Sequence, residues 1–267
     1  MFGAKNLKID MDGAFMEIAA FGKGERNLII LPGLGDGLTT VGGKAFPMAL
    51  MYRLFAKDFR VFMMSRRKPL PADFDTEKMA ADIAAAMDKL GIEKANFVGV
   101  SMGGMITQHF CADFPERVSK AVLVVTAAKP SEILSANIEE WTEMAKRGDG
   151  AALMDSNVRN MYSDGYYRKN RWLTPIMGKI AVPKNPERFL SMAKACAEHD
   201  AFSKLEKIKA PVLIICGTED RTVGADASYE MAKKIPGARL FAYEGFRHAL
   251  YEEAPDFNKK VLDFLNE

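Results

Sequence analysis

"ANFVGVSMGGMITQHF", residues 95 to 110, joins a mostly apolar run to a run of helical period through a turn that is rich in glycine. A continuous apolar run of this length is typical of a strand buried on both faces of a parallel sheet. Gly99 and Gly103 allow the strand and the helix to approach closely, and the turn between them carries one hydroxyl, on Ser101. Ser101 is therefore either a nucleophile raised from a sheet edge or only a small residue at a tight turn.

The same strand pattern returns along the chain, separated by segments of helical period. The clearest helix is predicted over residues 76–90, where Asp75 or Thr76 can cap the start and Gly91 stands at the end. Near the N-terminus, Asp12-Gly13 predicts a hairpin turn between two short strands. Strands that alternate with such helices predict an α/β fold, with a mostly parallel, doubly wound sheet of about eight strands. The other buried strands are expected at residues 27–31, 60–64, 121–125 and 211–216.

The strand rhythm stops at Lys129-Pro130 and resumes near residue 210. Residues 131–200 contain only helical patterns, so we expect an inserted helical cap there, and a core domain made of residues 1–130 and 201–267. The cap is rich in aromatic residues, which either pack it onto the core or line a substrate pocket. These aromatic residues are Trp141, Tyr162, Tyr166, Tyr167 and Trp172.

Composition narrows the class of protein. The chain has 267 residues, a formal net charge of +2 and no basic stripe interleaved with aromatics, so nucleic acid is not an expected partner. No apolar run approaches the roughly 18 residues of a membrane span, and no signal peptide is recognised, so a cytoplasmic location is expected. Cys111, Cys196 and Cys216 are widely spaced in apolar surroundings and are expected to be free thiols. We expect no metal and no cofactor, because the chain has no CxxC and no P-loop.

A serine nucleophile needs a base, and the chain offers three histidines. His109 follows Ser101 on the same predicted helix, and His199 stands where the cap returns to the core. His248 follows the last predicted strand, at the carboxyl end of the sheet where active sites of open α/β folds collect. A carboxylate must orient the base, and Asp220 follows another strand, with Glu219 as a possible substitute.

With these residues in the order Ser101, Asp220, His248, the chain resembles the α/β-hydrolase superfamily with a helical cap. The stretches that carry the resemblance are "LPGLGDG" (31–37), "GVSMGG" (99–104), "FPERVSKAVLV" (114–124), "KIKAPVLIICGTEDRTV" (207–223) and "FRHALYEEAPDFNKKVLDFL" (246–265). The resemblance implies that Ser101 is the nucleophile, His248 the general base and acid, and Asp220 its orienting carboxylate. It also implies that the backbone N–H groups of Leu34 and Met102 bind the oxyanion. Some relatives pair, so a homodimer is possible.

Two stretches depart from the family. Many relatives carry His-Gly where this chain has Pro32-Gly33, and an Asp-x-Arg-Gly type of motif where it reads "MSRRKPLP", residues 64–71. The first change removes a side chain that braces the loop. The second places Arg66, Arg67 and Lys68 at the end of a strand, where they either meet an anionic group of the substrate or form a solvated basic loop.

The leading hypothesis is a serine hydrolase that cleaves small or medium carboxylic esters through an acyl-enzyme on Ser101. The same fold also supports carbon–carbon bond hydrolases, thioesterases and aminopeptidases, so these activities stay open. A hypothesis of another class is a non-catalytic protein that binds a small molecule on this scaffold.

Overall fold

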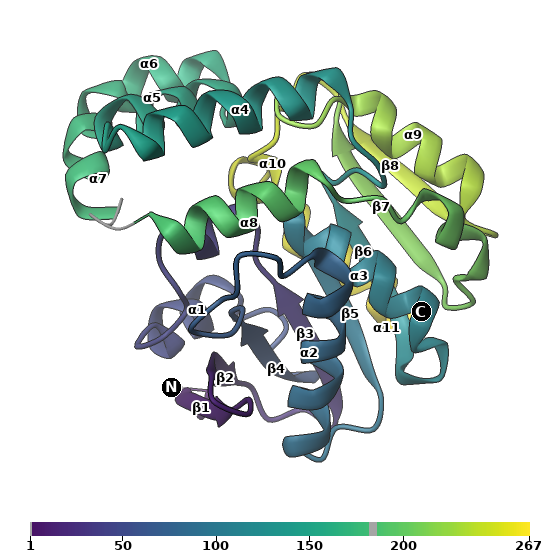
Figure 1. The fold of residues 1–267 in the computed structure, drawn as a ribbon. Coiled ribbons are helices and arrows are strands. Elements are labelled where there is room, and N and C mark those ends of the chain that lie inside the picture. The colour runs from purple at the N-terminus through teal and green to yellow at the C-terminus, as the bar shows by residue number, and fades with distance from the viewer. Residues whose placement is uncertain (1, 182–185) are drawn as a thin grey trace.

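The computed structural model describes residues 2–181 and 186–267 (Figure 1). Its strands form one sheet of eight, in the order β1-β2-β4-β3-β5-β6-β7-β8. The strands are β1 (Lys5–Asp10), β2 (Phe15–Phe21), β3 (Arg26–Leu31), β4 (Phe59–Met64), β5 (Ala95–Val100), β6 (Val118–Val124), β7 (Val212–Gly217) and β8 (Arg239–Tyr243).

Most neighbouring strands are parallel. β1 and β2 form the predicted hairpin, whose turn residues Asp12 and Gly13 both have positive φ. β2 also pairs antiparallel with β4, whereas β4, β3, β5, β6, β7 and β8 run parallel to one another. The prediction of a mostly parallel sheet of about eight strands is confirmed.

Helices cover both faces of this sheet (Figure 1). Successive side chains of β3 face opposite sides of the sheet. Ile29 and Leu31 pack with α2 and α3, whereas Leu28 and Ile30 pack with α1 and α11. The strands are therefore apolar on both faces, as the uninterrupted apolar runs indicate. The helices outside the β6–β7 connection are α1 (Ala45–Met51), α2 (Thr76–Lys89), α3 (Met102–Asp113), α9 (Ala225–Lys234), α10 (Leu250–Glu253) and α11 (Phe257–Asn266), with short 3₁₀ turns η1 (Leu34–Gly37), η2 (Pro115–Arg117) and η4 (Phe202–Lys207).

The connection from β6 to β7 contains helices and no strand among its described residues. These helices gather beyond one end of the sheet (Figure 1), and Ser131 caps the first of them by accepting a hydrogen bond from the N–H of Leu134. The location agrees with the expected insertion, while the division into core and cap domains stays a prediction. The elements are α4 (Glu132–Lys146), α5 (Gly150–Met161), α6 (Asp164–Asn170), η3 (Arg171–Leu173), α7 (Thr174–Ala181) and α8 (Glu187–Ala197).

Two further expectations concern the chain as a whole. Within the described residues, no helix is both long and apolar enough to cross a membrane. Cys111, Cys196 and Cys216 are buried free thiols, as expected.

Candidate active site

Ser101 stands between β5 and α3 in a strained backbone conformation. Its φ of 54° and ψ of −119° are rare for a residue with a side chain. Backbone hydrogen bonds hold it there: its N–H donates to the carbonyl of Val124 at 2.8 Å, and its carbonyl accepts from the N–H of Gly104 and the hydroxyl of Thr126, each at 2.8 Å. Because the main chain is fixed on both sides, the direction of the Ser101 Cα–Cβ bond is fixed as well.

The glycines around Ser101 are required by close packing. A Cβ on Gly103 would overlap the carbonyl of Leu31, at the end of β3. A Cβ on Gly99 would overlap the carbonyl of Gly103 and the side chain of Thr107. The glycine pattern in the sequence therefore reflects the packing of α3 directly against the ends of β3 and β5.

Asp220 and His248 come together because the loops after β7 and β8 lie against each other. The N–H of Thr218 donates to the carbonyl of Tyr243, and the N–H of Glu219 donates to that of Phe246, each at 3.0 Å. His248 Nδ1 lies 2.8 Å from Asp220 Oδ2, and both side chains are buried.

The backbone orients Asp220 in turn. Its Oδ1 accepts hydrogen bonds from the N–H groups of Thr222, at 2.8 Å, and Val223, at 3.1 Å. Glu219 is exposed to solvent, so Asp220 and not Glu219 is the carboxylate beside His248.

Ser101, His248 and Leu34 line one cavity of about 410 Å³. Asp220 lies behind His248, and Met102 is fully buried beside Ser101. Among the described residues, the Ser101 hydroxyl has no hydrogen-bond partner, and Ser101 is partly exposed at the cavity wall. The cavity wall is largely apolar and includes Val41, Met48, Met63, Val100, Trp141 and Met161.

The two backbone N–H groups expected to bind an oxyanion belong to residues near Ser101, one next to it in the chain and one on the loop after β3. Met102 is the first residue of α3, and the first N–H groups of a helix have no partner within the helix. Leu34 begins η1, and the preceding residue is close to the serine, since a Cβ on Gly33 would lie 3.2 Å from Ser101 Cβ. This arrangement can stabilise a negative charge that develops on a molecule attacked by Ser101.

The other two histidines form a buried pair away from the cavity. The rings of His109 and His199 are nearly perpendicular, with centroids 5.2 Å apart, and His199 Nδ1 lies 2.9 Å from the Thr76 hydroxyl. Burial, together with the neighbouring His109, lowers the pKa of His199 to about 3. Both residues therefore serve the packing of α3 and not the site.

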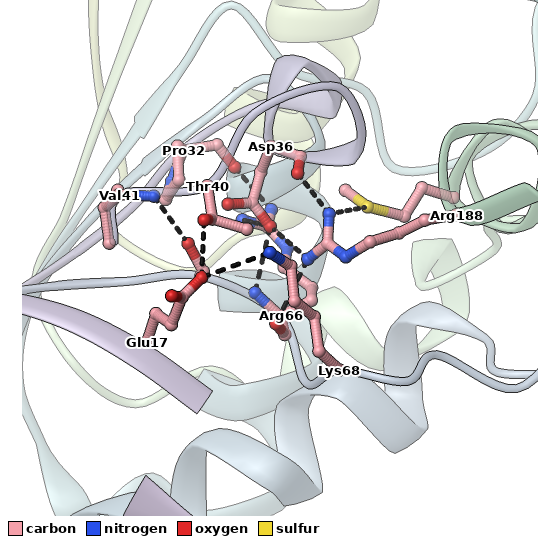
Figure 2. Close-up of polar contacts among 10 residues, drawn as sticks. Glu17, Pro32, Asp36, Thr40, Val41, Arg66, Lys68 and Arg188 are labelled. Carbon is pink, nitrogen blue, oxygen red and sulfur yellow. Dashed lines mark hydrogen bonds and ion pairs between the residues drawn. The ribbon is translucent and has the colours of Figure 1, made fainter. Parts of the chain in front are cut away.

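Arg66 is neither a solvated residue nor a group that faces the cavity, so both predictions for it are wrong. It is 3% exposed and donates hydrogen bonds to Asp36 and to the carbonyl of Pro32 (Figure 2). Burial lowers the pKa of the Arg66 guanidinium, although the nearby Asp36 carboxylate opposes this change. The next two residues are held by carboxylates, Arg67 by Asp82 and Lys68 by Glu17 at 3.2 Å.

The five aromatic residues expected in the cap are predicted either to pack it onto the core or to line a substrate pocket. Trp141 lines the cavity, whereas Trp172 is 67% exposed. No sequence motif singled out Asp36 or Arg188, which are joined by a hydrogen bond of 2.8 Å. Asp36 lies in residues 32–37, the loop after β3, which we call the Leu34 loop. Within residues 2–181 and 186–267, no group of three or more His, Cys, Asp or Glu side chains could hold a metal ion.

Comparison with known proteins identifies the family. A family model described as the alpha/beta hydrolase fold matches residues 26–255. The chain belongs to this family. This result confirms the resemblance inferred from the sequence motifs and makes the protein a member of a hydrolase family.

Several alpha/beta hydrolases are similar over most of the chain. 3-Oxoadipate enol-lactonase 2 of Acinetobacter baylyi is 26% identical over 251 residues, which is 92% of this chain and 91% of the relative. A 2-hydroxy-6-oxo-6-phenylhexa-2,4-dienoate hydrolase of Comamonas testosteroni is 30% identical over 204 residues, 70% of this chain and 68% of the relative. The crystal structure of the enol-lactonase from Burkholderia xenovorans LB400 has a TM-score of 0.83 and 25% identity, covering 98% of this chain and all of that one.

Proposed function

We propose that this alpha/beta hydrolase cleaves carboxylic esters through an acyl-enzyme on Ser101. The observation that carries the proposal is that Ser101 and His248 line the same cavity, with Asp220 bound to His248 Nδ1. Asp220 leaves His248 Nε2 as the nitrogen available to accept a proton. The triad would then consist of Ser101, His248 and Asp220.

The reaction proceeds in two halves. His248 Nε2 takes the Ser101 proton as Oγ bonds to the ester carbon, and the N–H groups of Leu34 and Met102 stabilise the resulting oxyanion. The carbon–oxygen bond of the ester breaks as His248 gives its proton to the departing alcohol. Water then attacks the acyl-enzyme, with His248 again as the base, and releases the acid and free Ser101.

The cavity favours a small or medium ester. Its volume of about 410 Å³ lies at the lower end of the usual range of roughly 300 to 1,000 Å³ for small-molecule sites. Its apolar wall suits an aliphatic or aromatic group on the acyl or alcohol side. The enol-lactonase relatives support ester chemistry, because a lactone is a cyclic ester.

A carbon–carbon bond hydrolase is the second candidate. It is supported by the 30% identity to the dienoate hydrolase of Comamonas testosteroni, whose named substrate contains a ketone and no ester. The thioesterase and aminopeptidase alternatives, and a non-catalytic binding protein, have no comparable observation in their favour. A panel of p-nitrophenyl esters, thioesters, aminoacyl arylamides and 2-hydroxy-6-oxo-dienoates distinguishes the enzymes.

The central test is the Ser101→Ala variant, with Ser135→Ala on the exposed face of α4 as the control. On the best ester of the panel, we expect Ser101→Ala to lower kcat by a factor on the order of 10⁶, because the triad acts as a unit. Ser135→Ala should keep the activity of the unmodified protein. Retention of most activity by Ser101→Ala would refute the proposal.

A further inference from the structure

Asp36, Arg66 and Arg188 form an ionic group, which we call the Asp36 cluster (Figure 2). Asp36 and Arg66 are buried and Arg188 is partly buried. Asp36 belongs to η1, Arg66 follows β4, and Arg188 lies on α8. Asp36 Oδ2 accepts a hydrogen bond from the Arg66 N–H at 2.9 Å and one from Arg188 Nη2 at 2.8 Å. Arg188 Nη2 also donates to the Arg66 carbonyl at 3.1 Å, so each member contacts the other two.

The cluster also holds the backbone of the loop. Arg66 Nη2 donates to the carbonyl of Pro32, and Arg188 Nη1 donates to the carbonyl of Asp36. The carbonyl of Gly33 accepts from the Asp36 N–H at 3.2 Å. The carbonyl of Gly33 and the N–H of Leu34 belong to the same trans peptide and point in opposite directions. The hydrogen bond to the Gly33 carbonyl therefore turns the Leu34 N–H away from Asp36. The position of Asp36 therefore sets the direction of the Leu34 N–H.

Helix α8 packs directly against η1, which contains Asp36. A Cβ on Gly37 would lie 2.9 Å from the Cα of Phe189 and 3.3 Å from Met192 Sδ, so no side chain separates the helix from η1. Arg66 thus holds the loop from the side of the sheet, and α8 holds it from the side of the inserted helices. Because Arg188 does not line the cavity, its effect on a bound molecule must pass through the loop.

The cluster is poorly suited to a purely stabilising role. It sets two guanidinium groups against one carboxylate: Arg66 is 3% exposed and Arg188 is partly buried. Arg66 Nε and Nη1 and Arg188 Nε have no hydrogen-bond partner among the described residues. Removing charges from water costs free energy that an incompletely paired group does not regain. The cluster is therefore better explained by a role in function than by a contribution to stability.

We propose that the Asp36 cluster positions the Leu34 N–H for the oxyanion, and that Arg188 makes this alignment depend on α8. The inference rests on the proposed serine hydrolase function. It explains how the loop is held although Pro32 replaces the bracing histidine of many relatives. Arg66 and Arg188 do not line the cavity and are accordingly positioning residues. Asp36 lines part of the cavity wall, and its proposed role is also positioning, through the backbone of the loop.

The test compares Arg188→Met and Arg188→Lys with a control on the same helix, Lys194→Met, which alters an exposed side chain. Each variant is assayed for kcat and KM on an ester, and for the Ki of an alkyl trifluoromethyl ketone, whose adduct with Ser101 carries an oxyanion. We expect Arg188→Met to lower kcat about 10- to 100-fold with KM within about twofold, because misalignment by a fraction of an ångström weakens only the transition state. Ki should rise by the same factor as kcat/KM falls.

Two further readouts separate positioning from other roles. The pH profile of kcat/KM should keep its shape in Arg188→Met, because the substitution leaves Ser101, His248 and Asp220 unaltered. Arg188→Lys should recover part of kcat, because it restores the charge but not the forked hydrogen bonds. Thermal unfolding of each variant verifies that the protein is folded.

Three outcomes would overturn the inference. One is a wild-type kcat and Ki in folded Arg188→Met. Another is a raised KM with unchanged kcat, which would mean that Arg188 binds the substrate directly. The third is a wild-type protein that neither reacts with a fluorophosphonate at Ser101 nor cleaves esters, and this result contradicts the proposed function itself.

Discussion

Ser101 and Asp220 are each held in one fixed arrangement where the proposed chemistry needs them, and that of Ser101 is a strained backbone conformation. The backbone strain at Ser101 costs on the order of 1–3 kcal/mol, and the hydrogen bonds from Gly104 and Thr126 help to offset it. Asp220 is held by two backbone N–H groups, so it keeps one orientation relative to His248. Preorganised groups of this kind need no rearrangement when a charge develops.

Replacing the carboxylate beside His248 tests this arrangement. We expect Asp220→Asn to lower kcat by a factor of about 10⁴, because an amide can favour the wrong imidazole tautomer and does not stabilise the imidazolium. The neighbouring Glu219→Gln is the matched control and should keep its activity, since Glu219 is exposed. A large loss in Glu219→Gln with none in Asp220→Asn would contradict the assignment.

At the scale of elements, α3 packs against the residues that follow α8 through the pair His109 and His199. His199 has an ordinary pKa near 6.5 in the unfolded chain and about 3 in the fold, so only the unfolded chain gains a proton between these values. Stability is therefore lost as the pH falls below about 6.5, by roughly 2 kcal/mol at pH 5.

The His199→Gln variant tests this pH dependence. Glutamine cannot gain the proton and keeps a polar group near Thr76, so we expect the loss of unfolding free energy between pH 7.5 and 5 to shrink by roughly 2 kcal/mol. Urea unfolding at the two pH values measures it. An identical pH dependence in the variant and in the unmodified protein would show that His199 does not titrate as described.

Sequence patterns predicted the elements well because both faces of the strands are buried. The carboxyl ends of β7 and β8 meet at one edge of the sheet, so Asp220 and His248 could be placed together from their positions after strands. The Asp36 cluster could not be predicted in this way. Arg188 and Asp36 are separated by 152 residues, and three consecutive cations at Arg66 to Lys68 suggest a solvated loop until tertiary contacts bury the first of them.

At the scale of the whole molecule, two arginines tie helices α5, α6 and α8 to the loops that follow the strands; Arg247 is fully buried and Arg188 is partly buried. Arg188 reaches inward from α8, and Arg247, beside His248, reaches outward to the carbonyls of Tyr162, at 2.8 Å, and Arg159, at 3.2 Å. Arg247 also pairs with Asp164 at 2.8 Å. The inserted helices are thus held close to the Leu34 loop by Arg188 and close to His248 by Arg247. A cytoplasmic location and a possible homodimer stay predictions.

Removing the second of these links should weaken the whole fold. We expect Arg247→Met to lower the free energy of unfolding by about 1–3 kcal/mol, because two carbonyls lose a charged donor. Urea unfolding measures the change, with Arg168→Met on the exposed face of α6 as the control. Equal stabilities of the two variants would mean that Arg247 does not hold the inserted helices in place.

The reaction of the purified protein with a fluorophosphonate, followed by mass spectrometry of the modified peptide, tests most directly whether Ser101 is an activated nucleophile. We expect one modification, at Ser101, and its loss when His248 is replaced by alanine, because only an activated serine attacks the reagent at a useful rate. A folded protein whose Ser101 stays unmodified would mean that Ser101 is not the nucleophile of a serine hydrolase.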